Sequence, residues 1–267
     1  MNPQDYLSNS DYVFEDGIYS FNDDIQNKTK LNRINVLEDL GKGRVWKNVY
    51  AHYYRFLFVL RWLRKGTTLI DVGCGRGWLM DIIYRNKVNV SYIGIDLSKK
   101  SLMYAAKKKF KYPRILIHAN CVDIPLIDEK ADYVVCYEAI EHNDKENAIQ
   151  IISKCEKLLK PGGLFFLSTP IRKSTNWIFP QDHIYEWEYD EMSEFLISKK
   201  FEIINTYGCF GKKREMIQAL SPQEKELYEK LSDFYNWHVL SPIFSSLHPQ
   251  NSQGVVWFCK KQMKEEE

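Results

Sequence analysis

The sequence has almost no net charge and no paired cysteine motif. Its 37 basic and 35 acidic residues leave a formal charge of +2 on 267 residues, so no global field would draw the chain to a polyanion, and any contact with nucleic acid must be local. No C-x-x-C pair occurs among its cysteines, which are Cys74, Cys121, Cys136, Cys155, Cys209 and Cys259. Several lie in apolar runs, where a reduced thiol packs as a small hydrophobe. We therefore expect a reducing compartment, the cytoplasm.

Long apolar runs are also missing. The most hydrophobic candidate, residues 45–63, is interrupted by Lys47, His52, Arg55 and Arg61, so it cannot supply the roughly 20 uninterrupted apolar residues of a membrane span. It is typical of an amphipathic helix. The N-terminus is polar and acidic and has no basic segment followed by an apolar run, which argues against a secretory signal.

Strands and helices alternate from residue 66 onward. The expected strands are 68–73, 91–96, 114–119, 131–138 and 163–169, and the expected helices between them are 77–85, 98–110 and 144–159. Strands that are apolar throughout and alternate with helices predict a parallel sheet covered on both faces. The sequence therefore belongs to the α/β class.

The C-terminal part of the sequence predicts an antiparallel edge of the sheet and an insertion between its two last strands. After a helix over about 189–199, the β-like runs 201–208 and 254–261 could pair antiparallel at the sheet edge. Residues 209–253 between them predict a lid, built from a helix over about 222–237 and a Pro- and Ser-rich tail. This gives an N-terminal helical cover over 1–65, a core over 66–208, the lid over 209–253 and a last strand with its tail over 254–267.

A glycine-rich turn follows the first strand of the alternation. The segment LIDVGCGRGWL places Gly73, Gly75 and Gly77 after Asp71, and glycines there let a ligand approach the N–H groups that open the next helix. A dinucleotide fingerprint would need glycine in place of Trp78, and the carboxylate of Asp71 would repel a pyrophosphate. The turn therefore favours a nucleoside-like ligand with positive charge and no phosphate.

S-adenosylmethionine is such a ligand, because its ammonium and sulfonium groups are cationic and its adenosine carries no phosphate. Asp96, after the second strand, is placed to accept both ribose hydroxyls. Through LIDVGCGRG, YIGIDLS, ADYVVCYEAIEH and LLKPGGLFFLSTP, in that order, residues 69–208 resemble the class I S-adenosylmethionine-dependent methyltransferases. The resemblance implies a seven-stranded, mostly parallel, doubly wound, Rossmann-like sheet. It also implies cofactor binding by Asp71, Gly73, Cys74, Gly75, Asp96, Leu97, Asn120, Cys121 and Glu138.

One position departs from that family. Asn120 stands where the family commonly has Asp to accept from the adenine amino group, and an amide oxygen can still accept that bond. Cys121 would then turn its backbone N–H toward the ring, so its thiol is incidental.

The candidate reaction centre follows the fourth strand of the core. Methyl transfer from the cofactor is an in-line displacement, and alignment alone can supply roughly 7–11 kcal/mol, so a base is not obligatory. The run EAIEH places Glu138, Glu141 and His142 where parallel strands present their functional ends, and His183 in QDHIYEW could join them. Two carboxylates and imidazoles suit a divalent ion such as Mg or Mn.

That set resembles the metal site of small-RNA terminal 2′-O-methyltransferases. Glu138, Glu141, His142 and His183 match its ligands, and the aromatic segment after them matches YEW at 185–187. The Glu-x-x-Glu-His run is also frequent in small-molecule methyltransferases, including ubiquinone-pathway O-methyltransferases. In that interpretation the two histidines are base candidates and the two glutamates orient them.

We expect from this an O-methyltransferase that acts on a hydroxyl of a sugar or other small molecule. The rival within enzymes is metal-dependent 2′-O-methylation of an RNA 3′ end. A rival of another class is a methyltransferase-like subunit that binds a partner without catalysis. The sequence leaves the acceptor open, because its specificity would lie in residues 1–65 and 170–253, where the resemblance is thinnest.

Overall fold

The computed structural model describes residues 1–21, 49–173, 178 and 180–263. The strands are β1 (Val13–Glu15), β2 (Ile18–Ser20), β3 (Thr68–Val72), β4 (Ser91–Asp96), β5 (Arg114–His118), β6 (Ala131–Tyr137), β7 (Leu159–Pro170), β8 (Phe201–Phe210) and β9 (Gly254–Lys261). The α-helices are α2 (Val49–Leu60), α3 (Trp78–Arg85), α4 (Lys99–Ala106), α5 (Lys145–Leu158), α6 (Tyr189–Ser198), α7 (Lys213–Ala219), α8 (Pro222–Ser232) and α9 (Trp237–Leu247). Short 3-10 helices are η1 (Pro3–Asp5), η2 (Ile140–His142) and η3 (Pro249–Asn251).

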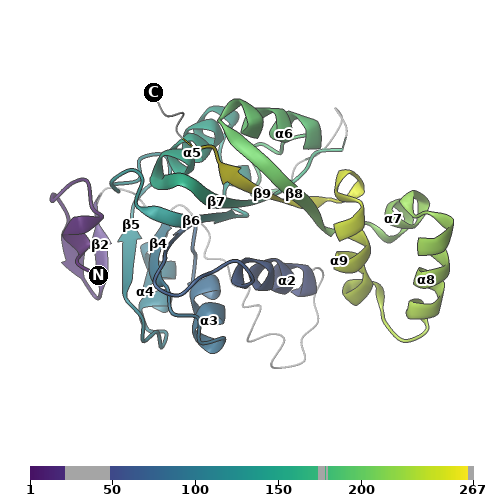
Figure 1. Ribbon diagram of the computed structural model, residues 1–267, viewed down its shortest axis with the longest axis horizontal. Coiled ribbons are helices and arrows are strands. Elements are labelled where there is room, and N and C mark those ends of the chain that lie inside the picture. Colours follow the sequence, from purple (N-terminus) through teal and green to yellow (C-terminus); the bar gives the residue numbers. More distant parts are fainter. Residues whose placement is uncertain (22–48, 174–177, 179, 264–267) are drawn as a thin grey trace.

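The strands form one sheet in the order β1-β2-β5-β4-β3-β6-β7-β9-β8 (Figure 1). Strands β5, β4, β3, β6 and β7 are parallel, and β9 pairs antiparallel with both β7 and β8. The seven strands from β5 to β8 confirm the predicted Rossmann-like sheet and its antiparallel edge. Because β9 is the reversed strand, β8 ends at the same edge as the parallel strands.

The N-terminus adds two strands that the sequence analysis missed. Strands β1 and β2 form a hairpin, and β2 extends the sheet beside β5, with Tyr19 opposite Ile117. Asp16 and Gly17 turn the hairpin with φ of 52° and 80°, the conformation that an Asp-Gly pair favours in a tight β-turn. The predicted helical cover over 1–65 is therefore wrong for this hairpin, while the part of that cover over 22–48 lies outside the described residues.

Helices cover both faces of the sheet, as the doubly wound prediction requires. Ile152 of α5 and Met192 of α6 belong to the buried cluster on one face, and Val59 of α2 and Leu79 of α3 belong to the cluster on the other. Figure 1 shows α5 and α6 together on one side of the strands and α2, α3 and α4 on the opposite side. Of the predicted N-terminal cover, the described residues form the α-helix α2 and the short 3-10 helix η1.

The segment between β8 and β9 forms helices α7, α8 and α9, which extend beyond the sheet edge (Figure 1). Its Pro- and Ser-rich tail contains a helix that the sequence analysis did not predict, because α9 has Pro242 inside it. Asn236 caps its first turn by accepting from the N–H of Val239. Phe244 and Leu240 then pack into a small core with α7. Whether the insertion acts as a lid stays a prediction.

Within the described part of the chain, no helix is long and apolar enough to cross a membrane.

Candidate active site

The glycine-rich turn is tied to the next strand by backbone hydrogen bonds. The N–H groups of Gly73 and Cys74 both donate to the carbonyl of Ile95, each at 2.9 Å. The Asp96 carboxylate accepts from the N–H of Gly75 at 2.7 Å and from the N–H of Ser98 at 2.8 Å. Asp96 thus joins the turn after β3 to the start of α4.

Two glycines of the turn differ in the space around them. A Cβ on Gly73 would lie 2.7 Å from the Cβ of Ala139, and its φ of 75° is the left-handed conformation that glycine favours. A Cβ on Gly75 would meet no atom within 4 Å. The space beside Gly75 is therefore open, as a ligand approaching the N-terminus of α3 requires.

The carboxyl group of Asp71 is buried next to this turn. It accepts a hydrogen bond from the hydroxyl of Tyr92 at 2.6 Å. Burial raises its pKa to about 7, and the nearby Asp96 adds to the rise, although the Tyr92 hydrogen bond opposes it. A cation beside Asp71 would stabilise the ionised carboxylate, so this buried acid fits the ammonium group of S-adenosylmethionine.

The expected adenine segment lies where the sequence predicts it, after β5. The amide oxygen of Asn120 accepts from the N–H of Val122 at 3.1 Å, which leaves a second lone pair for an amino group. The carbonyl of Leu97 accepts from the ring of His118 at 3.1 Å. Burial raises the pKa of the Cys121 thiol, so that thiol stays protonated, in accord with an incidental role.

Glu138 directly follows β6 in a strained conformation and is held by two partners. Its φ of 51° is rare for a residue with a side chain and is typical of functional sites. Its carboxylate pairs with the Arg55 guanidinium at 2.9 Å and accepts from the Ser168 hydroxyl at 3.0 Å. Burial raises the pKa of Glu138, but Arg55, His52 and Ser168 outweigh burial and hold the pKa below its usual value.

Glu141 has a different environment from Glu138, although both were predicted as ligands or catalytic groups. Its side chain is 1% exposed and accepts from the Thr169 hydroxyl at 3.5 Å. Burial, with the charge of Glu138, raises its pKa well above the usual value. Its backbone carbonyl accepts from the N–H of Ile184 at 2.8 Å, so Glu141 fixes the loop that follows β7.

His142 of η2 meets His183 of that loop together with an acid that the sequence analysis missed. The side chains of His142, Asp182 and His183 place one ligand atom each within 4.8 Å of one another. His142 also bonds through Nδ1 to the carbonyl of Asp182 at 2.8 Å. Of the four predicted metal ligands, the structure brings only the two histidines into this group, because Glu138 is paired with Arg55 and Glu141 is buried. Two imidazoles and one carboxylate fit a borderline divalent ion better than Mg.

His183 also forms a pair with Glu186. Its Nδ1 bonds to the Glu186 carboxylate at 2.5 Å, and Glu186 is 1% exposed. Burial lowers the pKa of His183, but the bond to Glu186 and the surrounding acids outweigh it, so the pKa is raised. An imidazole oriented through Nδ1 by a buried carboxylate leaves Nε2 available to accept a proton, which is the geometry of a general base.

Arg55 is the functional candidate that the sequence analysis missed, since it named this residue only as an interruption of the apolar run over 45–63. It is 7% exposed, and its guanidinium lies against the rings of Phe56 and Tyr137. The signal was its spacing, since Ala51, Arg55 and Val59 lie four residues apart along α2 and all three are buried. A charge in line with an apolar stripe indicates a buried partner.

Comparison with known proteins agrees with this geometry. Residues 70–167 match the family model described as a methyltransferase domain. A protein of Mycolicibacterium smegmatis described as a probable S-adenosylmethionine-dependent methyltransferase is 33% identical over 150 residues, which are 54% of this chain and 56% of the relative. A ubiquinone biosynthesis O-methyltransferase of Coxiella burnetii is 32% identical over 118 residues, 43% of this chain and 48% of the relative. The chain therefore spans about half the length of the curated relatives that it matches.

Solved structures share the fold at low sequence identity. A methyltransferase from Archaeoglobus fulgidus that depends on S-adenosylmethionine has a TM-score of 0.57 at 16% identity, covering 85% of this chain and 98% of the other. Magnesium protoporphyrin IX methyltransferase from Synechocystis with bound S-adenosylmethionine has a TM-score of 0.52 at 16% identity, covering 90% and 88%. With the matched family, the strand order and the glycine-rich turn in agreement, this chain carries a class I S-adenosylmethionine-dependent methyltransferase domain.

Proposed function

We propose that this protein is an O-methyltransferase that transfers the methyl group of S-adenosylmethionine to a hydroxyl of a small molecule or sugar. The observation that carries the proposal is the His183–Glu186 pair on the loop after β7. Parallel sheets of this class present their functional groups at the carboxyl ends of the strands. A hydroxyl is a weak nucleophile until it loses its proton, so an oriented imidazole at this edge favours oxygen as the acceptor atom.

In this reaction one group of residues would bind the cofactor and a second group, His183 and Glu186, would accept the proton. The turn around Gly75 and the carboxylate of Asp96 would hold the cofactor, which would supply its methyl group to the acceptor oxygen, with the cofactor sulfur as the leaving group. The acceptor proton passes to Nε2 of His183, and Glu186 stabilises the resulting imidazolium. Positioning of the two reactants contributes the larger share of the acceleration.

The matched relatives support an oxygen acceptor. The Coxiella protein is named for O-methylation in ubiquinone biosynthesis, and an O-methyltransferase of the same name from Idiomarina loihiensis is 33% identical over 129 residues. On this basis we include a small-molecule acceptor in the proposal.

We also propose that the protein works in a reducing compartment such as the cytoplasm, because its six cysteines are free thiols.

A second candidate function rests on the cluster of His142, Asp182 and His183. An ion held there could engage ribose hydroxyls, as in metal-dependent 2′-O-methylation of an RNA 3′ end. The pairing of Glu138 with Arg55 counts against it, because that carboxylate is already neutralised.

The test is methyl transfer from labelled S-adenosylmethionine into cell extract that is separated into RNA, DNA, lipid and small-molecule fractions, with and without chelator. We expect label in the small-molecule fraction that resists chelator and is lost in His183→Gln but kept in the control His238→Gln. Chelator-sensitive label in RNA would favour the second candidate. No detectable cofactor binding at millimolar concentration in calorimetry would contradict both and favour a non-catalytic binding subunit.

A further inference from the structure

Tyr92 and Asp71 come into contact across two neighbouring strands next to the glycine-rich turn. Asp71 of β3 lies opposite Gly94 of β4, and Tyr92 precedes Gly94 by two residues (Figure 1). Residues two apart on a strand face the same side of the sheet, so the Tyr92 ring reaches Asp71 by crossing Gly94. A Cβ on Gly94 would lie 2.9 Å from Cε1 of Tyr92. The absence of a side chain at Gly94 is therefore what admits the contact.

The two carboxylate oxygens of Asp71 have different surroundings. Oδ2 accepts from the hydroxyl of Tyr92 at 2.6 Å. This length falls in the range of about 2.5–2.7 Å for a hydroxyl that donates to an ionised carboxylate, below the roughly 2.7–2.8 Å of a neutral pair. Oδ1 has no hydrogen-bond partner in the described part of the chain, and it keeps accessible surface although the whole residue is 5% exposed. One oxygen is held from inside the protein, and the other is open to a ligand.

The groups around Asp71 leave Tyr92 as the one that favours the ionised form. Burial and the nearby Asp96 raise the pKa of Asp71, and the Tyr92 hydrogen bond lowers it. Burial raises the pKa of the neighbouring thiols and phenol, so these stay neutral near pH 7. They are Cys74 in the turn, Cys121 after β5 and Tyr137 in β6.

We propose that Tyr92 is a positioning residue for the cofactor, because its hydroxyl holds Oδ2 of Asp71, favours the ionised carboxylate and leaves Oδ1 to bind the ammonium group of S-adenosylmethionine. The inference rests on the proposed function for the cofactor and is independent of the acceptor. Tyr92 is 0% exposed, so it touches no ligand itself. Its effect reaches the cofactor through Asp71 and should therefore depend on pH and on an ammonium group in the ligand.

The test compares two ligands that share an adenosine, with affinities measured by calorimetry on the full chain. S-adenosylhomocysteine carries the ammonium group, and methylthioadenosine lacks it. At pH 6 we expect Tyr92→Phe to bind S-adenosylhomocysteine about tenfold more weakly than the unchanged protein, as a rise of about one unit in the pKa of Asp71 requires. At pH 8.5, where Asp71 is ionised in both proteins, the two affinities should nearly agree. Methylthioadenosine should bind both proteins equally at either pH.

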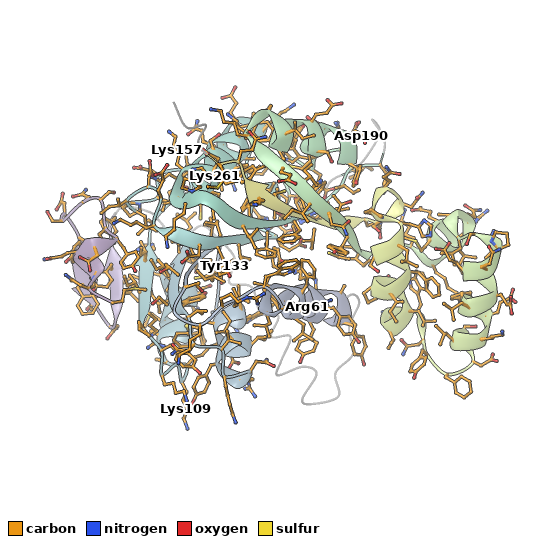
Figure 2. The ribbon with its side chains drawn as sticks, in the orientation of Figure 1. Arg61, Lys109, Tyr133, Lys157, Asp190 and Lys261 are labelled. Carbon is orange, nitrogen blue, oxygen red and sulfur yellow. The ribbon has the colours of Figure 1, made fainter. Side chains whose placement is uncertain are left out.

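Tyr133→Phe is the matched control. Tyr133, labelled in Figure 2, belongs to the same buried cluster as Tyr92, but its hydroxyl donates to the carbonyl of Trp62 at 2.8 Å. This variant should bind both ligands as the unchanged protein does. In an Asp71→Asn background, Tyr92→Phe should have no further effect on S-adenosylhomocysteine, because the carboxylate through which it acts is absent.

Several outcomes would each overturn the inference. They are an unchanged affinity at pH 6, an equal loss for both ligands, a loss of the same size at pH 6 and pH 8.5, an equal loss in Tyr133→Phe, and a loss that persists in the Asp71→Asn background. Methyl transfer by a protein in which Tyr92→Phe has no effect would contradict this inference alone. The expected effect of Tyr92→Phe without any methyl transfer would contradict the proposed function alone.

Discussion

The predicted cofactor half of the site and its proposed acceptor half are held together by different kinds of contact. In the cofactor half, backbone N–H groups of the turn after β3 bond to Ile95 and Asp96 at the end of the neighbouring strand. In the acceptor half, buried side chains meet from distant segments, and Arg55 and Ser168 are 113 positions apart. The first half is encoded locally, and the second exists only after the whole sheet has formed.

This difference predicts how amino-acid substitutions in each half affect ligand affinity and stability. A backbone turn depends on a few positions whose conformation or size is fixed, such as Gly73 and Asp96. A buried charge pair depends on both partners, because removal of one leaves the other in a medium that cannot solvate it. We therefore expect substitutions in the cofactor half to affect ligand affinity and those at Arg55 to affect stability.

The largest expected effect is that of Asp96→Ala on cofactor affinity. Its carboxylate accepts from two backbone N–H groups and is placed for the ribose, and each hydrogen bond to a charged group is worth about 1.5–3 kcal/mol. We expect calorimetry to show a loss of S-adenosylmethionine affinity of about 10²–10⁴-fold. Asp123→Asn, at an exposed residue of the next loop, is the control and should bind normally. Normal affinity in Asp96→Ala would contradict the assignment.

The Arg55–Glu138 pair gives the next largest effect, on the acceptor side of the comparison. Arg55→Met leaves the Glu138 carboxylate, whose side chain is 19% exposed, without its ion-pair partner. Breaking such a pair costs about 3–5 kcal/mol in free energy of unfolding. Adding Glu138→Gln removes the unpaired charge, so the double variant should be more stable than Arg55→Met alone. Chemical denaturation measures all three proteins. Additive losses would show that the two side chains do not act as a pair.

The local geometry of the predicted cofactor residues followed from the sequence, because its signals are local. Asp71, Gly73, Gly75 and Asp96 lie within one strand–turn–helix–strand unit, and the structure joins Gly75 to Asp96 by a hydrogen bond. That these residues bind the cofactor stays a prediction. The parallel core and the antiparallel pairing of β8 with β9 followed from apolar runs. The N-terminal hairpin was missed although its Asp16–Gly17 turn is a local signal.

The acceptor half could not be predicted in this way, because its partners are set by tertiary packing. A Glu-x-x-Glu-His run suggested that Glu138 and Glu141 point to one ion, yet the positive φ of Glu138 and the burial of Glu141 separate their environments. Nothing local in the sequence paired Arg55 with Glu138 or Asp182 with the histidines. The helical nature of α9 was likewise decided by its packing on α7, against the local preference of proline.

Glu186→Gln tests whether the His183 pair acts in catalysis, with a smaller expected effect. The amide keeps the shape of the carboxylate but cannot stabilise an imidazolium, so we expect turnover to fall about 10²-fold with cofactor affinity unchanged. Glu188→Gln is a matched control two residues away, where the carboxylate pairs with Arg172 at the surface. Equal turnover in both variants would show that the buried carboxylate only fixes the loop.

The smallest expected effect is a proton released by Asp71 when the cofactor binds. Burial raises the folded-state pKa of this acid from an ordinary 3.8 to about 7. The neutral acid is therefore favoured by folding, and its contribution to stability is full below the ordinary pKa and lost as pH rises toward 7. A cation beside the carboxylate reverses this preference, so binding at pH 7 should release about half a proton.

Calorimetry in two buffers with different ionisation enthalpies measures that release. Asp71→Asn cannot lose a proton there, so its binding enthalpy should not depend on the buffer, and its thermal stability should lose the decline between pH 4 and pH 7 that this group causes. The result also separates the two halves of the site, because a proton released by Asp71 measures a change in the cofactor half alone. The same proton release in Asp71→Asn as in the unchanged protein would mean that another group responds to the cofactor and that Asp71 serves only its bond to Tyr92.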